Sequence, residues 1–404
     1  MIFKSFGGKL HVPSISSMKS LHLSIVIVVG MGILVSLGLL VLLSPHTIAG
    51  NPRILSSSNT KPYFAGIAVN PITHKVYVCD YGEKQIHVLD AQTNQTLAYI
   101  QINGNPWDVA VNPVTNKVYV VNRDSYTAIT VIDGSSDQVI NSINLIDMGT
   151  QPPQMTFDAG RNPPTYYKIE PVQVAVNPIT NKVYVNDWNF PDGGITVIDG
   201  KTDTVIDTIL GLGGASYGIG INPNTNRIYV DNFQDVHGMP FDVTVIDGTT
   251  DKILTNVTIG ISGITGVSTI PAALRVVPLA VNPSNNSIYA TCWGCLDPDK
   301  HRRGDWISVI NGTTNNVVDR IPISASGLAV DPNSNTLYAA MAVDPVGKIG
   351  SFDIAIIDGK NNKITGYLKS DNGVFNVAVN PSSGNVYVTG NFPKSSVSLF
   401  SFES

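Results

Sequence analysis

The stretch VAVNPVTNKVYV, which runs from Val109 to Val120, occurs in recognisable form seven times along the 404-residue chain. Each copy has a short apolar run, an Asn-Pro or Asp-Pro pair, a polar turn, and a second short run with Tyr at its centre. The pairs begin at Asn70, Asn112, Asn177, Asn222, Asn282, Asp331 and Asn380. A unit of this size cannot bury its own apolar surface, so the repetition predicts an architecture of packed repeats.

One repeat reads as four antiparallel strands. In the second copy these cover 107–111, 117–121, 129–133 and 138–143, with polar turns at 112–116 and 134–137. The strands are rich in Val, Ile, Thr and Tyr, which favour sheets. Seven four-stranded units predict an all-β fold, a seven-bladed β-propeller, with a linear solenoid as the alternative.

The end of the repeat array predicts how the ring closes. The seventh copy stops one strand short, and the run from Arg53 to Ser57 can supply the missing outer strand. That pairing would remove an open sheet edge. The sequence therefore predicts one propeller domain over 50–404, with its N-terminal strand closing the last blade.

The N-terminus predicts that the rest of the chain lies outside the cytoplasm. Residues 1–20 are basic and would stay in the cytoplasm, and residues 21–49 contain an uncharged run from Ser24 to Leu43. This run is long enough to cross a bilayer as a helix. An uncleaved transmembrane anchor and a cleaved signal peptide both fit, and both place the remainder at the cell surface or outside it, anchored or secreted.

The glycosylation sequons and the cysteines are consistent with a location outside the cytoplasm. Four Asn-x-Ser/Thr triplets predict N-glycosylation, at Asn94, Asn256, Asn285 and Asn311. Cys292 and Cys295 predict a local disulfide, with a thiol or metal role as the alternative. Cys79 is expected to be a buried, inert thiol.

Composition excludes one class of partner and gives little support to catalysis. The net charge of -5 and scattered Lys and Arg argue against nucleic-acid binding, which needs a basic face. No His-Glu-x-x-His or Gly-x-Ser-x-Gly motif occurs. No cofactor is expected, although calcium or another metal held by Asp and Asn oxygens in the central channel stays an alternative.

The repeats resemble the YVTN β-propeller family of archaeal surface-layer proteins and related bacterial proteins. The matching segments are Asn112–Val120, Asn177–Val185, Val197–Asp203 and Val245–Asp251, and Tyr-Val-Thr itself occurs at 387–389. The resemblance covers residues 65–402. It implies a seven-bladed propeller displayed outside the cell, and it implies no particular reaction.

Repeat lengths predict which face of the propeller binds. The Asn-Pro turns and the turns between third and fourth strands vary little and share one face, which we call the turn face. The longer connections, 145–171, 231–242, 259–277, 292–306 and 341–353, share the opposite loop face. Elaborated loops on a regular scaffold are typical of a binding surface.

The expected binding residues on the loop face are aromatic or polar. They are Trp107, Asp108, Arg123, Asp187, Trp188, Tyr217, Asp231, Phe233, His237, Trp293, His301 and Arg302. Such side chains suit a protein or glycan partner. An equally open interpretation is that the rings only pack under long loops.

Two functions follow from the sequence. The favoured one is a non-catalytic cell-surface platform that binds a protein or glycan through its loop face, with membrane attachment through the N-terminal helix. The alternative is an extracytoplasmic metal-dependent hydrolase or lyase, or a redox enzyme, with its site at the channel mouth.

Overall fold

The computed structural model divides the chain into two units, Met1–Ser44 and Pro45–Ser404. It describes residues 51–53, 63–123, 129–145, 171–187, 194–213, 215–233, 239–262, 278–297, 303–341, 353–370, 372–392 and 395–402. The predicted cytoplasmic segment 1–20 and the predicted anchor or signal segment 21–49 lie outside these residues. In the part that is described, no helix has the length and apolarity needed to span a membrane.

The described part is built from antiparallel strands, as the sequence predicts. The first three repeats form β2 (Phe64–Asn70), β3 (Lys75–Asp80), β4 (Gln85–Asp90), β5 (Thr96–Gln101), β6 (Asn105–Asn112), β7 (Lys117–Arg123), β8 (Ile129–Asp133), β9 (Gln138–Ile143), β10 (Pro171–Asn177), β11 (Lys182–Asp187), β12 (Gly194–Asp199) and β13 (Thr204–Leu210). Each repeat makes one four-stranded sheet, with its strands in chain order. The all-β prediction of four-stranded antiparallel sheets is confirmed.

The next two repeats are joined. They form β14 (Ala215–Asn222), β15 (Arg227–Phe233), β16 (Pro240–Asp247), β17 (Ile253–Ser262), β18 (Leu279–Asn282), β19 (Ser287–Leu296), β20 (Arg303–Asn311) and β21 (Asn316–Ile321). The ends of β17 and β19 pair, Ile261 with Leu296 and Ser262 with Cys295. This pairing merges the two four-stranded units into one eight-stranded sheet.

The last repeats complete the set. They form β22 (Ala325–Asp331), β23 (Thr336–Met341), β24 (Asp353–Asp358), β25 (Lys363–Lys369), β26 (Gly373–Val379), β27 (Val386–Phe392) and β28 (Ser396–Phe400). The short β1 (Asn51–Arg53) adds to β28, and the sheet order is β1-β28-β27-β26. The added strand thus lies at 51–53, whereas the sequence placed it at 53–57, of which 54–57 lie outside the described residues.

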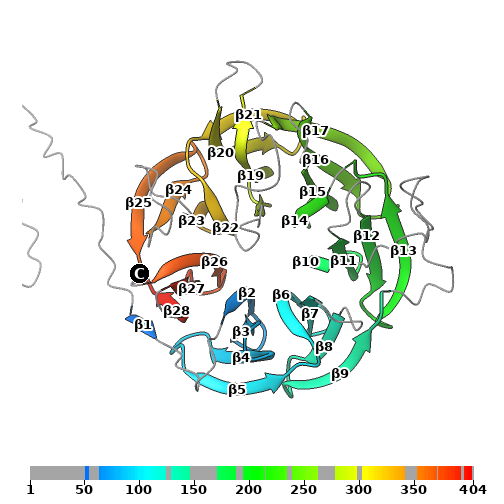
Figure 1. Ribbon diagram of the computed structural model, residues 1–404, viewed down its shortest axis with the longest axis vertical. Helices are drawn as coiled ribbons and strands as arrows, with labels where there is room; N and C mark the ends of the chain where they lie inside the picture. Colours follow the sequence, from blue (N-terminus) through cyan, green and yellow to red (C-terminus); the bar gives the residue numbers. More distant parts are fainter. Residues whose placement is uncertain are drawn as a thin grey trace, which may run out of the picture. The chain divides into compact units, whose positions relative to one another are not determined.

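The sheets are arranged around a centre lined by the first strand of each repeat (Figure 1). Along the chain, β2, β6, β10, β14, β18, β22 and β26 each contact the next, and β26 contacts β2. The strand that carries the repeated Tyr is almost fully buried, whereas the fourth strand alternates between buried and exposed residues. Apolar cores therefore lie between neighbouring sheets, and the fourth strands form the outer rim.

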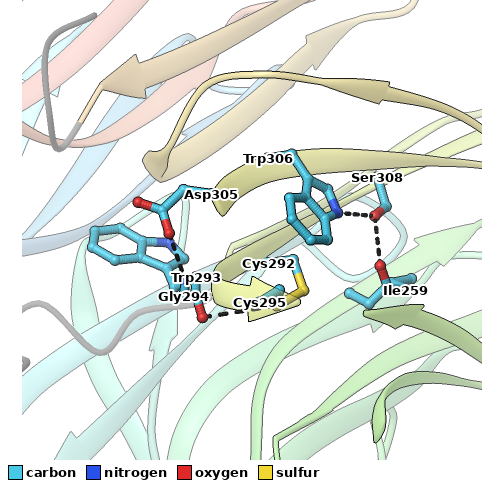
Figure 2. Close-up of a disulfide and its surroundings, with 8 residues drawn as sticks. All are labelled: Ile259, Cys292, Trp293, Gly294, Cys295, Asp305, Trp306 and Ser308. Carbon is cyan, nitrogen blue, oxygen red and sulfur yellow. Dashed lines mark hydrogen bonds between the residues drawn. A yellow bond between two sulfur atoms is a disulfide. The ribbon is translucent and has the colours of Figure 1, made fainter. Parts of the chain in front are cut away.

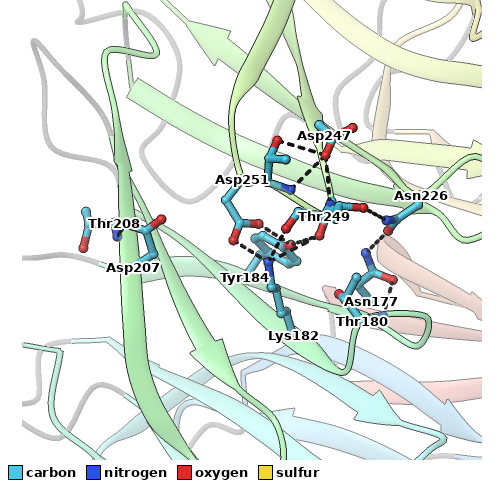
Figure 3. Close-up of polar contacts among 12 residues, drawn as sticks. Asn177, Thr180, Lys182, Tyr184, Asp207, Thr208, Asn226, Asp247, Thr249 and Asp251 are labelled. Atoms are coloured by element: carbon cyan, nitrogen blue, oxygen red, sulfur yellow. Dashed lines mark hydrogen bonds and ion pairs between the residues drawn. The ribbon is translucent and has the colours of Figure 1, made fainter.

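A Lys and a Tyr of one sheet bind an Asp in a turn of the next sheet, and we call this arrangement the clasp. It joins each of the first three sheets to the sheet that follows it. The Lys117 ammonium lies 2.8 Å from the Asp203 carboxylate, and the Tyr119 hydroxyl donates to the other oxygen of Asp203 at 2.8 Å. Lys75 and Tyr77 hold Asp137 in the same way, and Lys182 and Tyr184 hold Asp251 (Figure 3). The clasp uses turn residues of one repeat to anchor the strand of its neighbour.

A chain of asparagines runs beside the clasp. Asn112 donates from Nδ2 to Oδ1 of Asn181, 2.7 Å away, in the turn of the next repeat. Equivalent bonds join Asn70 to Asn116, Asn177 to Asn226, Asn222 to Asn286 and Asn282 to Asn335. Each acceptor has a positive φ of 51–56°, a backbone conformation that Asn tolerates. These asparagines of the turn face are thus engaged in contacts between sheets.

The clasp predicts that equivalent tyrosines differ in their contribution to stability. We expect Tyr119→Phe to lower the free energy of unfolding by about 1–2 kcal/mol, because it removes a buried hydrogen bond to a carboxylate. Tyr289 occupies the same repeat position and is equally buried, but its hydroxyl has no hydrogen-bond partner among the described residues. Tyr289→Phe is therefore the matched control, and denaturant titration should show it to be nearly neutral. Equal losses in both variants would contradict the clasp.

Candidate functional site

The loop-face ends of the inner strands gather aromatic rings at one repeat position. Trp107, Tyr217 and Phe375 each lie five residues before an Asn-Pro pair, and they share one apolar cluster with Tyr63 and Tyr81. These rings come from the repeats of β2, β6, β14 and β26. The inner strands thus bring together side chains that are more than 300 residues apart in sequence.

The rings in this group contact one another directly. Tyr63 stacks on Trp107 with centroids 6.3 Å apart, and it meets Phe375 edge-on at 5.8 Å. Tyr81 approaches Trp107 edge-on at 5.9 Å. We call Tyr63, Tyr81, Trp107 and Phe375 the aromatic cluster. Such edge and offset contacts stabilise ring pairs beyond the area that they bury.

Arg123 covers the aromatic cluster. Its guanidinium lies 4.3 Å from the centre of the Trp107 ring, a cation–π distance. Burial raises the pKa of the Tyr63 hydroxyl, and the nearby Arg123 charge opposes that rise. Trp107 and Tyr217 are only 8% and 6% exposed, so most of their surface serves packing. Arg123, Tyr63 and Tyr81 are half-buried and remain partly accessible.

Asp108 lies beside the aromatic cluster, where three inner strands meet. Its Oδ2 accepts a hydrogen bond from the Val174 amide at 3.0 Å, in the next repeat. On the other side it packs against Gly66, where a Cβ would lie 2.7 Å from Asp108 Oδ1. Part of its surface stays accessible, yet loss of solvation raises the pKa of the Asp108 carboxyl to about 7. Desolvation disfavours the charged form.

Asp231 is more deeply buried than Asp108, at 3% exposure. Its Oδ1 accepts from the amides of Tyr217 and Gly218, and its Oδ2 has no hydrogen-bond partner among the described residues. Burial raises the pKa of the Asp231 carboxyl to about 7, although the two amide bonds work against that rise. A carboxyl with a pKa near neutrality can both take up and release a proton.

Irregular backbone pairing explains why polar residues occur at the loop-face ends of the strands. The register between β14 and β15 shifts between Ser216 and Ile219, which leaves amides without a ladder partner. Asp231 binds two of these amides, and in the preceding sheet Asn186 Oδ1 binds the Gln173 amide at 2.6 Å. Buried amides need such partners. Backbone capping therefore accounts for part of what these side chains do.

The acidic residues predicted on the loop face, Asp108, Asp187 and Asp231, come from three different repeats. Among the described residues, no group of three or more His, Cys, Asp or Glu side chains is placed to hold a metal ion. Asp187, at the end of β11, accepts a hydrogen bond from the Ser216 hydroxyl at its backbone carbonyl. His237, another residue predicted on the loop face, lies outside the described residues.

Cys292 and Cys295 form a disulfide, with the predicted loop-face residue Trp293 between them in the chain (Figure 2). Both cysteines are fully buried, and a Cβ at Gly260 would lie 2.6 Å from Cys292 Sγ. The bridge closes a bulge in β19 where that strand reaches β17. Trp293, between the two cysteines, is half-buried and donates from Nε1 to the Ala325 carbonyl at 3.2 Å. The bridge and Trp293 therefore tie together three consecutive repeats.

Several predicted residues lie outside the described part of the chain. They are Trp188, His301 and Arg302, and the side chain of Phe233, besides His237. Cys79, expected to be buried, is a buried free thiol.

The four sequons differ in accessibility. Asn94 is 2% exposed and donates from Nδ2 to the Val397 carbonyl, so its amide is not available in the folded chain. Asn285 is exposed, but its Nδ2 donates to Asn335 and Gly359. Asn311 accepts turn amides at its Oδ1, and Asn256 is exposed on the outer strand β17. The geometry thus favours Asn256 and disfavours Asn94 as a glycan acceptor.

Sequence reasoning missed three members of the aromatic cluster. Phe375 shares the repeat position of Trp107 and Tyr217, and aligning the copies on their Asn-Pro pairs would have found it. Tyr63 precedes the first copy, and Tyr81 follows a strand, so neither has a periodic signal. Packing of the first repeat against the second brings them to Trp107.

The raised pKa of Asp231 predicts a pH-dependent stability. Between about pH 4 and pH 7 the folded state holds a proton that the unfolded state has released, so folding stability falls as pH rises through this window. We expect Asp231→Asn, which keeps the acceptor oxygen, to show a smaller fall in its thermal midpoint from pH 4 to pH 8. The exposed Asp207→Asn is the control and should follow the wild type. Parallel pH profiles for all three proteins would rule out a raised pKa at Asp231.

Comparison with known proteins supports the fold and leaves the activity open. No family model matches the chain. It is 23% identical over 250 residues to "Uncharacterized protein YncE" of Salmonella typhi and of Salmonella typhimurium, covering 53% of this chain and 63% of each relative. The chain thus spans less than two thirds of the length of these relatives.

A solved structure resembles most of the chain. The Kuenenia stuttgartiensis hydrazine synthase superposes with a TM-score of 0.64 and 16% sequence identity, over 87% of this chain and 99% of that one. At this identity the likeness concerns the fold alone. Together with the four-stranded antiparallel sheets, it supports a β-propeller fold.

Proposed function

We propose that the chain is a seven-bladed β-propeller of the YVTN type that acts at the cell surface as a rigid platform and binds a protein or glycan partner through its loop face. In this assignment the eight-stranded sheet counts as two blades, β14–β17 and β18–β21. The N-terminal segment anchors or exports the domain.

One observation carries the proposal: the two faces are used differently. On the turn face, Lys, Tyr, Asn and Asp side chains are engaged in the clasp and the asparagine chain between sheets. On the loop face, Arg123 and the rims of Tyr63 and Tyr81 stay partly accessible above a packed base. A rigid base under accessible aromatic and cationic groups suits recognition of a partner surface or a sugar ring.

Partner retention tests this assignment. We expect the double variant Tyr81→Ser, Arg123→Ser to retain at least about tenfold less partner from a host envelope extract, since aromatic and Arg residues carry much of the energy of an interface. The matched control is Tyr367→Ser, Lys360→Ser, which removes a Tyr and a cation from the outer rim and the turn face. Quantitative pull-down gives the retention, and the unfolding midpoint checks the fold. Equal retention by both variants would count against loop-face binding.

An enzyme remains the second candidate because of Asp108 and Asp231. Their carboxyl pKa values are both raised to about 7 by desolvation. Asp108 lies toward the loop-face end of the inner strand β6, and Asp231 lies toward the loop-face end of the second strand β15. Carboxyls with pKa values near neutrality are suited to general acid–base catalysis. Against this, backbone amides already occupy one oxygen of each.

Native mass spectrometry with elemental analysis separates the two candidates. On residues 50–404, purified without added metal or chelator, we expect the mass of the polypeptide plus any glycan. A stoichiometric metal or small molecule would instead favour the enzyme. Asp108→Asn and Asp231→Asn variants would then show whether the bound species depends on these carboxyls.

A further inference from the structure

We infer that the turn face docks on a lipid bilayer through Ile72, Val114 and Ile179, so that the loop face points away from the membrane. This inference deepens the proposed surface function, on which it rests, by giving the propeller an orientation.

These three residues form one apolar patch on the turn face. Each directly follows the Pro of an Asn-Pro pair, in three consecutive repeats, and their exposed fractions are 52%, 58% and 62%. The turns that carry them are neighbours, since Asn70 bonds to Asn116 and Asn112 to Asn181. Three β-branched side chains therefore project from adjacent turns into solvent.

The other repeats have polar residues at this position, and most of these fasten the ring. Asn224 donates to the Pro283 carbonyl at 2.8 Å, Ser284 to Pro332 at 2.6 Å and Asn333 to Pro381 at 2.6 Å. Each bond ties one turn to the next. Ile72, Val114 and Ile179 have no side-chain donor for such a bond to the next turn, and they expose apolar surface instead. Exposed apolar side chains on adjacent turns are typical of a surface that binds a partner or a membrane.

The pairing of β1 shows at which face this first described strand begins. Asn51 pairs with Leu399 and Arg53 with Val397, so β1 runs antiparallel to β28. Val386, which follows the last Asn-Pro turn, pairs with Phe400. The Phe400 end of β28 therefore belongs to the turn face, and so does Asn51, the first residue of β1.

A short length of chain separates this point from the apolar run that ends at Leu43. The seven residues 44–50 span at most about 25 Å when fully extended. A bilayer crossed by that apolar run is thus within reach of the turn face. Tethering also raises the effective concentration of a weak contact, so three side chains can suffice. These two facts favour a bilayer over a second protein as the occupant.

Depth-dependent quenching in phosphatidylcholine vesicles tests the orientation on the full chain. A fluorescent label goes on Val114→Cys, or on Lys369→Cys at the loop-face end of β25. The native cysteines do not compete, because Cys79 is buried and the other two are bridged. We expect spin-labelled lipid to quench the label at 114 several-fold more than the label at 369. Equal quenching, stronger quenching at 369, or failure of the chain to float with vesicles would overturn the inference.

A second pair of variants separates docking from mere tethering. Ile72→Asn with Ile179→Asn, which copies the residue of the repeats at Asn224 and Asn333, should reduce quenching at 114 several-fold. Leu97→Asn with Val318→Asn removes two comparably exposed apolar side chains from the outer rim and should leave it unchanged. Quenching that survives the first pair would refute docking through this patch. Partner retention is measured separately on soluble extracts, so a failure of the proposed function would be seen independently.

Discussion

The contact between neighbouring sheets is the constraint that shapes this molecule. A four-stranded sheet buries its faces only against the sheets on either side, and the Lys-Tyr-Asp clasp sets the register of those pairs. The clasp weakens around the ring: Arg227 replaces Lys and donates to the Gly312 carbonyl, and the Tyr289 hydroxyl has no partner in the described part. There the disulfide bulge and the β17–β19 pairing join the sheets instead. Neighbouring sheets are therefore joined by ion pairs and hydrogen bonds in one part of the ring, and by strand pairing and a disulfide-closed bulge in another.

The same constraint divides the two faces by role. The clasp and the asparagine chain lie on the turn face, whereas at the loop face Asp108 and Trp293 each bond to the next repeat. Even there, part of the polar character is structural, because Asp231 and Asn186 bind amides that bulges leave unpaired. Arg123, in contrast, is partly accessible to solvent. Recognition at the loop face and attachment at the turn face would thus use opposite ends of one rigid body.

The sequence predicted the repeated elements well and the site less well. Strand positions follow from alternation and turn residues, which are local, so the strand predicted at 107–111 is observed as Asn105–Asn112. Trp107 and Tyr217 were identified by residue type and by their place on the predicted loop face, but their burial depends on neighbours from distant repeats. Tyr63 and Tyr81 could not be found in this way, because nothing near them in the sequence indicates that they meet Trp107.

Repetition of one motif was sufficient to establish sheet composition, strand order and the distinction between regular turns and variable loops, because each of these follows from contacts within a single repeat. Contacts between repeats settled the remainder. Closure of the ring brings Tyr63 to Phe375, the β14–β15 bulge gives Asp231 its amide partners, and the pairing of β1 with β28 places Asn51 at the turn face. These outcomes depend on which surfaces meet in space, and local preference carries no information about that.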